Sequence, residues 1–169
     1  IEETIRSVLL QGYPNLEFII IDGCSTDGSV EIIKKYEPWL SHWESEPDRG
    51  QSHAINKGWE RASGEIVAYL CSDDIYFPNT LATVAMEFRN HPEVGMVTGG
   101  IAHADECSNL LGDQFPKLPN GTPTDLTLLD PDSWLLPQAS SFILKKNLSA
   151  IGAWVREDLH YTMDRELFY

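Results

Sequence analysis

Three shortages in this sequence each exclude a class of protein. Cysteine is scarce: Cys24, Cys71 and Cys107 lie far apart and form no CxxC pair, so neither a zinc site nor a disulfide framework is indicated. These unpaired cysteines favour a reducing, cytoplasmic compartment. Lysine and arginine number 12 against 26 acids, and the net charge of −14 argues against nucleic acid as a partner. Apolar runs are too short to span a bilayer, which predicts no transmembrane segment in these residues.

The apolar residues that are present recur with alternating helical and strand periods. The 169 residues, 42% of them apolar, suffice for one domain with a packed core. Helices are predicted over residues 1–10, 29–36, 51–62 and 80–89, the last capped by Asn79. Strands are predicted over residues 16–21, 39–46, 66–70, 95–102 and 140–144, with a hairpin return over 107–114. This alternation predicts an α/β fold with a mostly parallel sheet flanked by helices.

The strand predicted over residues 66–70 ends in two acids, Asp73 and Asp74. Its unbroken apolar character is typical of a strand covered by helices on both faces. Ligands of open α/β sheets bind beyond the carboxyl ends of such strands. Two adjacent carboxylates there favour a Mg²⁺ or Mn²⁺ ion shared with substrate phosphates. A solvated turn before Pro78 is the alternative from these residues alone.

Other polar groups follow neighbouring strands and are predicted to share this rim of the sheet. Asp22 ends the strand over 16–21, and Asp48 and Arg49 follow the strand over 39–46. Because the ends of parallel strands meet at one edge, all of these groups are expected to face one ligand. Two simpler roles stay open: Asp22 could cap the turn at Ser25, and Arg49 could form a loop salt bridge with Asp48 or Glu46.

Four blocks of the sequence resemble the family 2 glycosyltransferases, in the family's order and spacing. They are IDGCSTDGS at 21–29, DRGQSHAINKGWERASGEIVAYLCSDDIYFPNT at 48–80, LLPQASSFILKK at 135–146 and YTMDREL at 161–167. The resemblance implies the Rossmann-like GT-A fold and an inverting transferase with a nucleotide-sugar donor, a divalent metal and one carboxylate base. It also implies a single domain over 1–169, with a nucleotide-sugar-binding half at 1–100 and an acceptor-side half at 101–169.

Carried over residue by residue, the resemblance implies roles in donor binding for five side chains. Asp22 matches an acid that contacts the uracil or ribose, and Asp48 and Arg49 lie where the family has further nucleotide contacts. Asp73 matches the metal ligand, and Asp74 is expected to contact the donor sugar or the acceptor. The sequence departs from the family's DxD motif just before these acids, because a cysteine occupies position 71.

The resemblance places the catalytic base at Asp164, in a motif where Met163 replaces the usual glutamate. The base would take a proton from the acceptor hydroxyl as that oxygen attacks the anomeric carbon. From the residues alone, Asp164 could instead stabilise the dipole of a helix that starts there. Glu166 and Gln138 are weaker candidates for acceptor contacts.

These implications predict an inverting transferase that uses Mn²⁺ or Mg²⁺, a UDP-sugar and a glycan or lipid-linked acceptor. Its expected setting is cell-surface polysaccharide or lipopolysaccharide synthesis, in the cytoplasm or at the inner face of the membrane. Two alternatives stay open. One is a degenerate domain that binds a sugar nucleotide without turnover, which Cys71 and Met163 favour. The other is a Mg²⁺-dependent enzyme of phosphoryl chemistry built on Asp73 and Asp74.

The chain is expected to be a fragment that lacks the first strand and the C-terminal part of the GT-A fold. In the resembled fold, a strand precedes the first helix and lies centrally in the sheet. That strand would precede Ile1, and the acceptor-binding part would follow Tyr169. Without the strand, a gapped nucleotide site is predicted.

Overall fold

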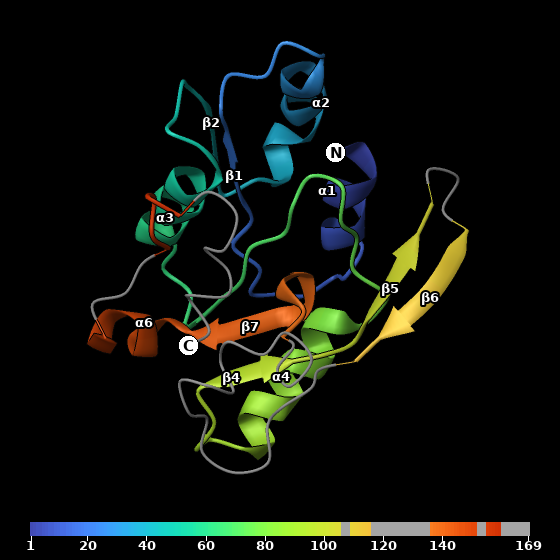
Figure 1. Ribbon diagram of the computed structural model, residues 1–169, viewed down its shortest axis with the longest axis vertical. Coiled ribbons are helices and arrows are strands. Elements are labelled where there is room, and N and C mark those ends of the chain that lie inside the picture. Colours follow the sequence, from blue (N-terminus) through green and yellow to red (C-terminus); the bar gives the residue numbers. More distant parts are fainter. Residues whose placement is uncertain (106–108, 116–135, 152–154, 160–169) are drawn as a thin grey trace.

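The computed structural model describes residues 1–105, 109–115, 136–151 and 155–159 (Figure 1). Its α-helices are α1 (Glu2–Leu9), α2 (Ser29–Tyr36), α3 (Gln51–Arg61), α4 (Thr80–Asn90) and α6 (Lys145–Ile151). Its strands are β1 (Ile19–Asp22), β2 (His42–Ser45), β3 (Ile66–Val67), β4 (Met96–Thr98), β5 (Ile101–Ala104), β6 (Leu110–Gln114) and β7 (Ser141–Leu144). In these residues, no helix has the length and apolar content needed to cross a membrane.

The predicted helices are confirmed, while several strands are shorter than predicted. The strand expected over 66–70 forms pairs only at Ile66 and Val67, and the strand expected over 95–102 divides into β4 and β5. Asn79 precedes α4 as predicted, but its side chain makes no capping hydrogen bond. Its φ of 69° lies in the left-handed region that asparagine tolerates, so Asn79 turns the chain into the helix rather than capping it.

The strand directions correct one part of the sequence prediction. β1 and β2 are parallel, with Ile19 opposite His42 and Asp22 opposite Ser45. The other pairs are antiparallel: β7 lies between β3 and β4, and β5 pairs with β6 in the predicted hairpin. The sheet is therefore not mostly parallel in the described residues, because the later strand β7 inserts between β3 and β4 in the opposite direction.

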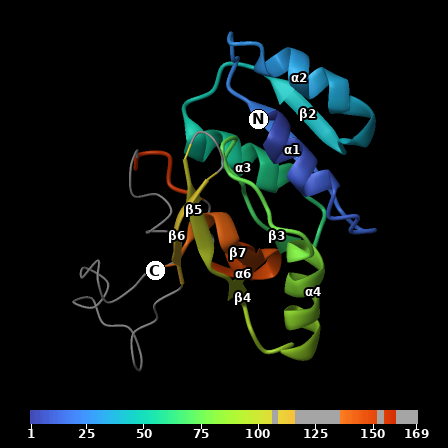
Figure 2. The ribbon, with the colours of Figure 1, turned by 90° about the vertical axis from the view of Figure 1, so that its right-hand side faces the viewer.

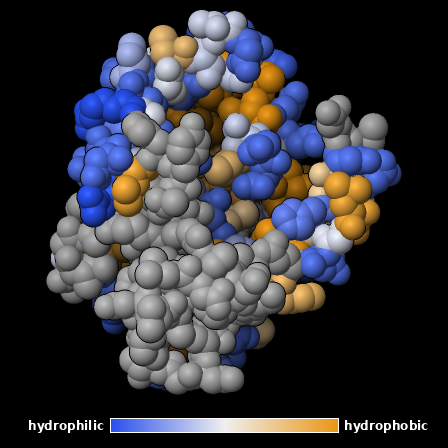
Figure 3. Space-filling view, viewed as in Figure 1, coloured by the Kyte–Doolittle hydropathy of each residue, from blue (hydrophilic) through white to orange (hydrophobic). Residues whose placement is uncertain are grey.

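A gap separates β1 from β3, which belong to different sheets in the described part of the chain. Figure 2 shows β2 at the opposite end of the view from the group of β3, β4 and β7. A cavity of about 810 Å³ lies in the gap, and its walls include Ile5, Ile20, Ile33, Val67 and Val84. Figure 3 shows apolar surface set back between polar residues in this upper region. The cavity reaches the ends of both strands.

The main core cluster joins α3 to the strands on the other side of this gap. It contains Ile55, Trp59, Val67, Ile143, Leu148 and Val155. Trp59 is 3% exposed, and its indole ring packs edge-on against the ring of Tyr69, with the ring centroids 6.0 Å apart. Burying aromatic surface of this size is a large stabilising term, so α3 is firmly fixed beside the strand ends.

Candidate functional site

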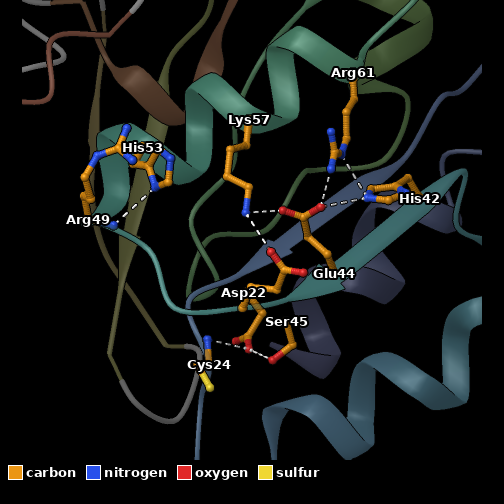
Figure 4. A network of polar contacts seen from close by, with 10 residues as sticks. Asp22, Cys24, His42, Glu44, Ser45, Arg49, His53, Lys57 and Arg61 are labelled. Carbon is orange, nitrogen blue, oxygen red and sulfur yellow. Dashed lines mark hydrogen bonds and ion pairs between the residues drawn. The ribbon is translucent and has the colours of Figure 1, made fainter.

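The carboxylate of Asp22 lies at the end of β1 and is organised by three donors. Its Oδ2 accepts hydrogen bonds from the Cys24 amide at 3.1 Å, the Ser25 amide at 2.9 Å and the Ser45 hydroxyl at 2.6 Å (Figure 4). Burial raises the pKa of Asp22, but the hydrogen bonds from Ser25, Ser45 and Cys24 outweigh it and hold the pKa below its ordinary value. The turn-capping role considered for Asp22 is therefore real, and it occupies one carboxylate oxygen.

The carboxylate of Asp48 lies directly against the backbone that follows Asp22. A Cβ atom built on Gly23 would come within 2.7 Å of Asp48 Oδ2, so only glycine fits at this position without displacing that carboxylate. The other oxygen, Oδ1, accepts a hydrogen bond from the Gly50 amide at 2.8 Å. The ends of β1 and β2 thus bring two of the predicted donor-binding acids together.

A second polar group follows β3. One possible ligand atom from each of Cys71, Asp73 and Asp74 lies within 4.8 Å of the others. Burial, followed by the charge of Asp73, raises the pKa of Asp74 above its ordinary value. The thiol of Cys71 accepts a hydrogen bond from Gln51 Nε2 at 3.1 Å. The cluster offers two carboxylates and a thiol, so its hard oxygen ligands fit Mg²⁺ or Mn²⁺ while the thiol also suits softer metals.

Gln138, predicted as a weak acceptor contact, lies beside this second group. Its Nε2 donates to the Tyr69 carbonyl at 2.7 Å, and its Oε1 lies 3.8 Å from the thiol of Cys71. Its amide therefore ties the turn before β7 to the chain that follows β3. The other predicted acceptor contact, Glu166, and the predicted base, Asp164, lie outside the described residues.

The two polar groups open onto the same cavity. Its lining includes Asp22 and Gly23 from the end of β1, and Cys71 and Asp73 from beyond β3. Gln51, at the start of α3, lines the cavity between them. Among the described residues, no lysine or arginine lines it. An anionic ligand in this cavity would therefore need a cation or backbone amides to balance its charge.

Arg49 makes a contact that the sequence did not predict. Its guanidinium donates to Glu157 Oε2 from Nε at 2.8 Å and from Nη2 at 2.7 Å, and not to its neighbour Asp48. The hydrogen bond from Arg49, assisted by one from Asn56, holds the pKa of Glu157 below its ordinary value. Glu157 lies 108 residues away along the chain, so no local pattern in the sequence could have identified the pair.

The sequence also missed an ion-pair network beside Asp22, shown in Figure 4. Glu44 of β2 has a side chain only 11% exposed, and it pairs with Lys57 and Arg61 of α3 and with His42. The hydrogen bond from Lys57 is the main cause that lowers the pKa of Glu44 to about 2. The lysine and arginine lie four residues apart on one face of α3, which was the only signal in the sequence. The network fixes α3 against β2 and so holds the end of β1 in place.

Comparisons with known proteins agree with this architecture. Two solved structures share the fold at 22% identity: TarS 1–349 of S. aureus in complex with UDP, and the mannosyltransferase PcManGT of Pyrobaculum calidifontis in complex with GDP-Man and Mn²⁺. The TM-scores are 0.66 and 0.67, over 98% and 94% of this chain and 48% and 44% of those chains. These likenesses confirm the predicted GT-A fold.

The sequence comparisons identify the family. The putative teichuronic acid biosynthesis glycosyltransferase TuaG of Bacillus subtilis (strain 168) is 46% identical over 77 residues, which are 44% of this chain and 31% of that protein. The chain thus spans less than half the length of each of these relatives. The sequence profile of the glycosyl transferase family 2 matches residues 1–149. The chain belongs to glycosyl transferase family 2.

Proposed function

We propose that this chain is the donor-binding part of an inverting glycosyltransferase that transfers a sugar from a UDP-sugar to an acceptor hydroxyl. The observation that carries the proposal is that Asp22 and Asp73, 51 positions apart, line one cavity at the ends of β1 and β3. TuaG is named for teichuronic acid biosynthesis, which supports cell-surface polysaccharide as the product. A glycan or lipid-linked acceptor and a place in the cytoplasm or at the inner face of the membrane belong to the same proposal.

The first polar group is suited to the nucleoside of the donor. The Cys24 and Ser25 amides and the Ser45 hydroxyl all donate to Oδ2 of Asp22. Its Oδ1 is proposed to accept from a ribose hydroxyl or from the N3–H of uracil. Asp48, beside Gly23, offers a second acceptor at the same strand end. Arg49 is proposed as a further nucleotide contact, and its ion pair with Glu157 fixes where its guanidinium lies.

The second polar group is suited to the diphosphate and its metal. Asp73 would ligate Mn²⁺ or Mg²⁺, with Asp74 and Cys71 close enough to share the ion or to contact the donor sugar. When bound, the metal neutralises negative charge on the leaving diphosphate. The lining of the cavity has no lysine or arginine in the described residues, which supports a role for such a cation.

The remaining step is removal of the acceptor proton, which we assign to Asp164. Inversion at the anomeric carbon is a single displacement, so no covalent intermediate on the protein is required. Gln138, beside the second polar group, and Glu166 are proposed to contact the acceptor or the sugar. The division into a donor half at 1–100 and an acceptor half at 101–169 follows from these assignments.

The proposal is tested by calorimetric titration of the full-length protein with UDP, GDP and dTDP, with and without Mn²⁺. We expect UDP to bind more tightly when Mn²⁺ is present, and Asp73→Asn to remove this dependence. Asp113→Asn, an exposed change on β6, is the matched control and is expected to leave it intact. Failure of all three nucleotides to bind the wild-type protein would refute the donor assignment.

The thiol of Cys71 in the ligand cluster favours a second candidate function, that of a degenerate sugar-nucleotide-binding domain. A degenerate domain would bind the sugar nucleotide but release no UDP from it. Measuring UDP release from the bound donor therefore separates the two functions. The phosphoryl alternative loses support, because it needs a basic phosphate cradle that is absent from the described lining.

A further inference from the structure

The segment 155–159 is fastened to α3 by one side-chain amide. Asn56 Nδ2 donates to the Val155 carbonyl at 2.8 Å, and the Val155 amide donates to Asn56 Oδ1 at 2.9 Å. The amide of Asn56 thus pairs with Val155 as a neighbouring strand would, satisfying both of its backbone groups. The Val155 side chain is 2% exposed and packs in the core cluster with Ile55 and Trp59. We call this pair of hydrogen bonds the Asn56 clamp.

The ion pair of Glu157 extends the clamp to the donor side. Its Oε2 accepts both hydrogen bonds from Arg49, and its Oε1 lies 3.4 Å from Asn56 Nδ2. Arg49 directly follows Asp48, whose carboxylate lies against Gly23 at the end of β1. A continuous set of contacts therefore joins the proposed nucleotide site to segment 155–159.

We propose that Asn56 and Glu157 are positioning residues of the transfer reaction, which hold segment 155–159 in register with the donor site. This inference rests on the proposed function, in which Asp164 removes the acceptor proton. Asp164 follows Glu157 by seven residues, so the length of the backbone keeps the base within about 25 Å of the clamped segment. Misplacing a catalytic group by about 1 Å can lower a rate about a hundredfold, so a clamp of two hydrogen bonds has a measurable effect on turnover.

The experiment compares Asn56→Ala with wild type in the full-length protein. Turnover is measured as release of UDP from UDP-glucose or UDP-GlcNAc, or of GDP from GDP-mannose, with the donor that the wild type turns over fastest. The other two readouts are binding of the matching diphosphate and amide hydrogen exchange over residues 155–159. We expect turnover to fall between about tenfold and a hundredfold. Affinity for the diphosphate is expected to stay within about twofold, since Asn56→Ala leaves the Arg49–Glu157 ion pair on the donor side in place. Exchange at the Val155 amide is expected to rise.

Glu157 supplies a second set of variants in case Asn56→Ala fails to fold. Its side chain is 32% exposed, so Glu157→Ala is expected to fold and to lose turnover. Glu157→Gln keeps one acceptor oxygen, which can still accept from Arg49, and is expected to recover part of that turnover. Asp113→Asn, an exposed change on β6 outside segment 155–159, is the control, with turnover unchanged.

Three results would overturn the positioning role. Faster exchange with unchanged turnover would make the clamp purely structural, and unchanged exchange would show that it does not hold the segment. A parallel loss of diphosphate affinity would place its effect on the donor instead. A wild-type protein that neither binds a nucleotide nor releases one from any donor refutes the proposed function itself, and the positioning role with it.

Discussion

The ends of β1 and β3 both carry acids, yet the two ends differ in how those acids are held. At β1, Asp22 is 8% exposed, receives three hydrogen bonds and has a lowered pKa. At β3, Asp73 is exposed, and burial together with the charge of Asp73 raises the pKa of Asp74. The acid at the first end is already satisfied by hydrogen bonds, whereas the second end places two like charges side by side. This contrast supports the proposal that the nucleoside binds at the first end and the metal with the diphosphate at the second.

The largest predicted effect is on the free energy of unfolding, and it concerns Glu44, whose ion pairs hold β2 against α3. Glu44→Ala leaves Lys57 and Arg61 without their shared partner, and the Lys57 side chain is only 18% exposed. We expect a loss of about 2 kcal/mol in the free energy of unfolding, because charged groups that lose a hydrogen-bonded partner are costly. Urea denaturation of wild type and Glu44→Ala measures this difference in the free energy of unfolding. Glu46→Ala, which removes a longer contact to Lys57 of 3.8 Å, is the control; an equal loss there would contradict the central role of Glu44.

A smaller effect, on binding rather than folding, is expected at Gly23. Gly23→Ala places a methyl group 2.7 Å from Asp48 Oδ2 and displaces that carboxylate from the end of β1. We expect UDP affinity to fall about tenfold, or about 1.4 kcal/mol, as measured by calorimetry. Gly112→Ala is the control, since a methyl group at Gly112 meets no atom within 4 Å. Unchanged affinity in Gly23→Ala would remove Asp48 from the proposed nucleotide site.

The Glu44 carboxylate is also expected to make stability depend on pH. The pKa of Glu44 falls from 4.5 to about 2 on folding, so the unfolded chain binds the proton more tightly than the folded protein does. Its stabilising effect is therefore present above pH 4.5 and is lost as the pH falls toward about 2. After allowance for screening by solvent, we expect wild type to lose about 1 kcal/mol more than Glu44→Gln over this interval. Parallel denaturation curves for the two proteins would contradict this expectation.

The sequence allowed prediction of both acid groups but not of their partners. Asp22 and Asp73 each follow an apolar run, and an acid after a buried strand is a local signal that a single sequence contains. Glu44 with Lys57, and Asn56 with Val155, are contacts between distant elements, and no local pattern encodes them. The direction of β7 was missed for the same reason, since the backbone of either direction fits the same apolar pattern.

The smallest predicted effect concerns Asp74, beyond β3, where removing the charge is expected to increase the free energy of unfolding rather than lower it. Because the pKa of Asp74 is raised on folding, its carboxylate lowers stability increasingly as the pH rises above 3.8. Asp74→Asn removes the cost of burying this charge and its repulsion by Asp73, so it is expected to raise the free energy of unfolding at neutral pH by about 0.5 kcal/mol when no metal is present. Asp113→Asn on the exposed strand β6 is the control, with no change expected.

With Mn²⁺ added, wild type should recover the difference, because a cation shared by Asp73 and Asp74 converts their repulsion into attraction. A destabilised Asp74→Asn protein would show that the β3 end is held by its own contacts, as the β1 end is, and would remove the physical reason for placing a metal there.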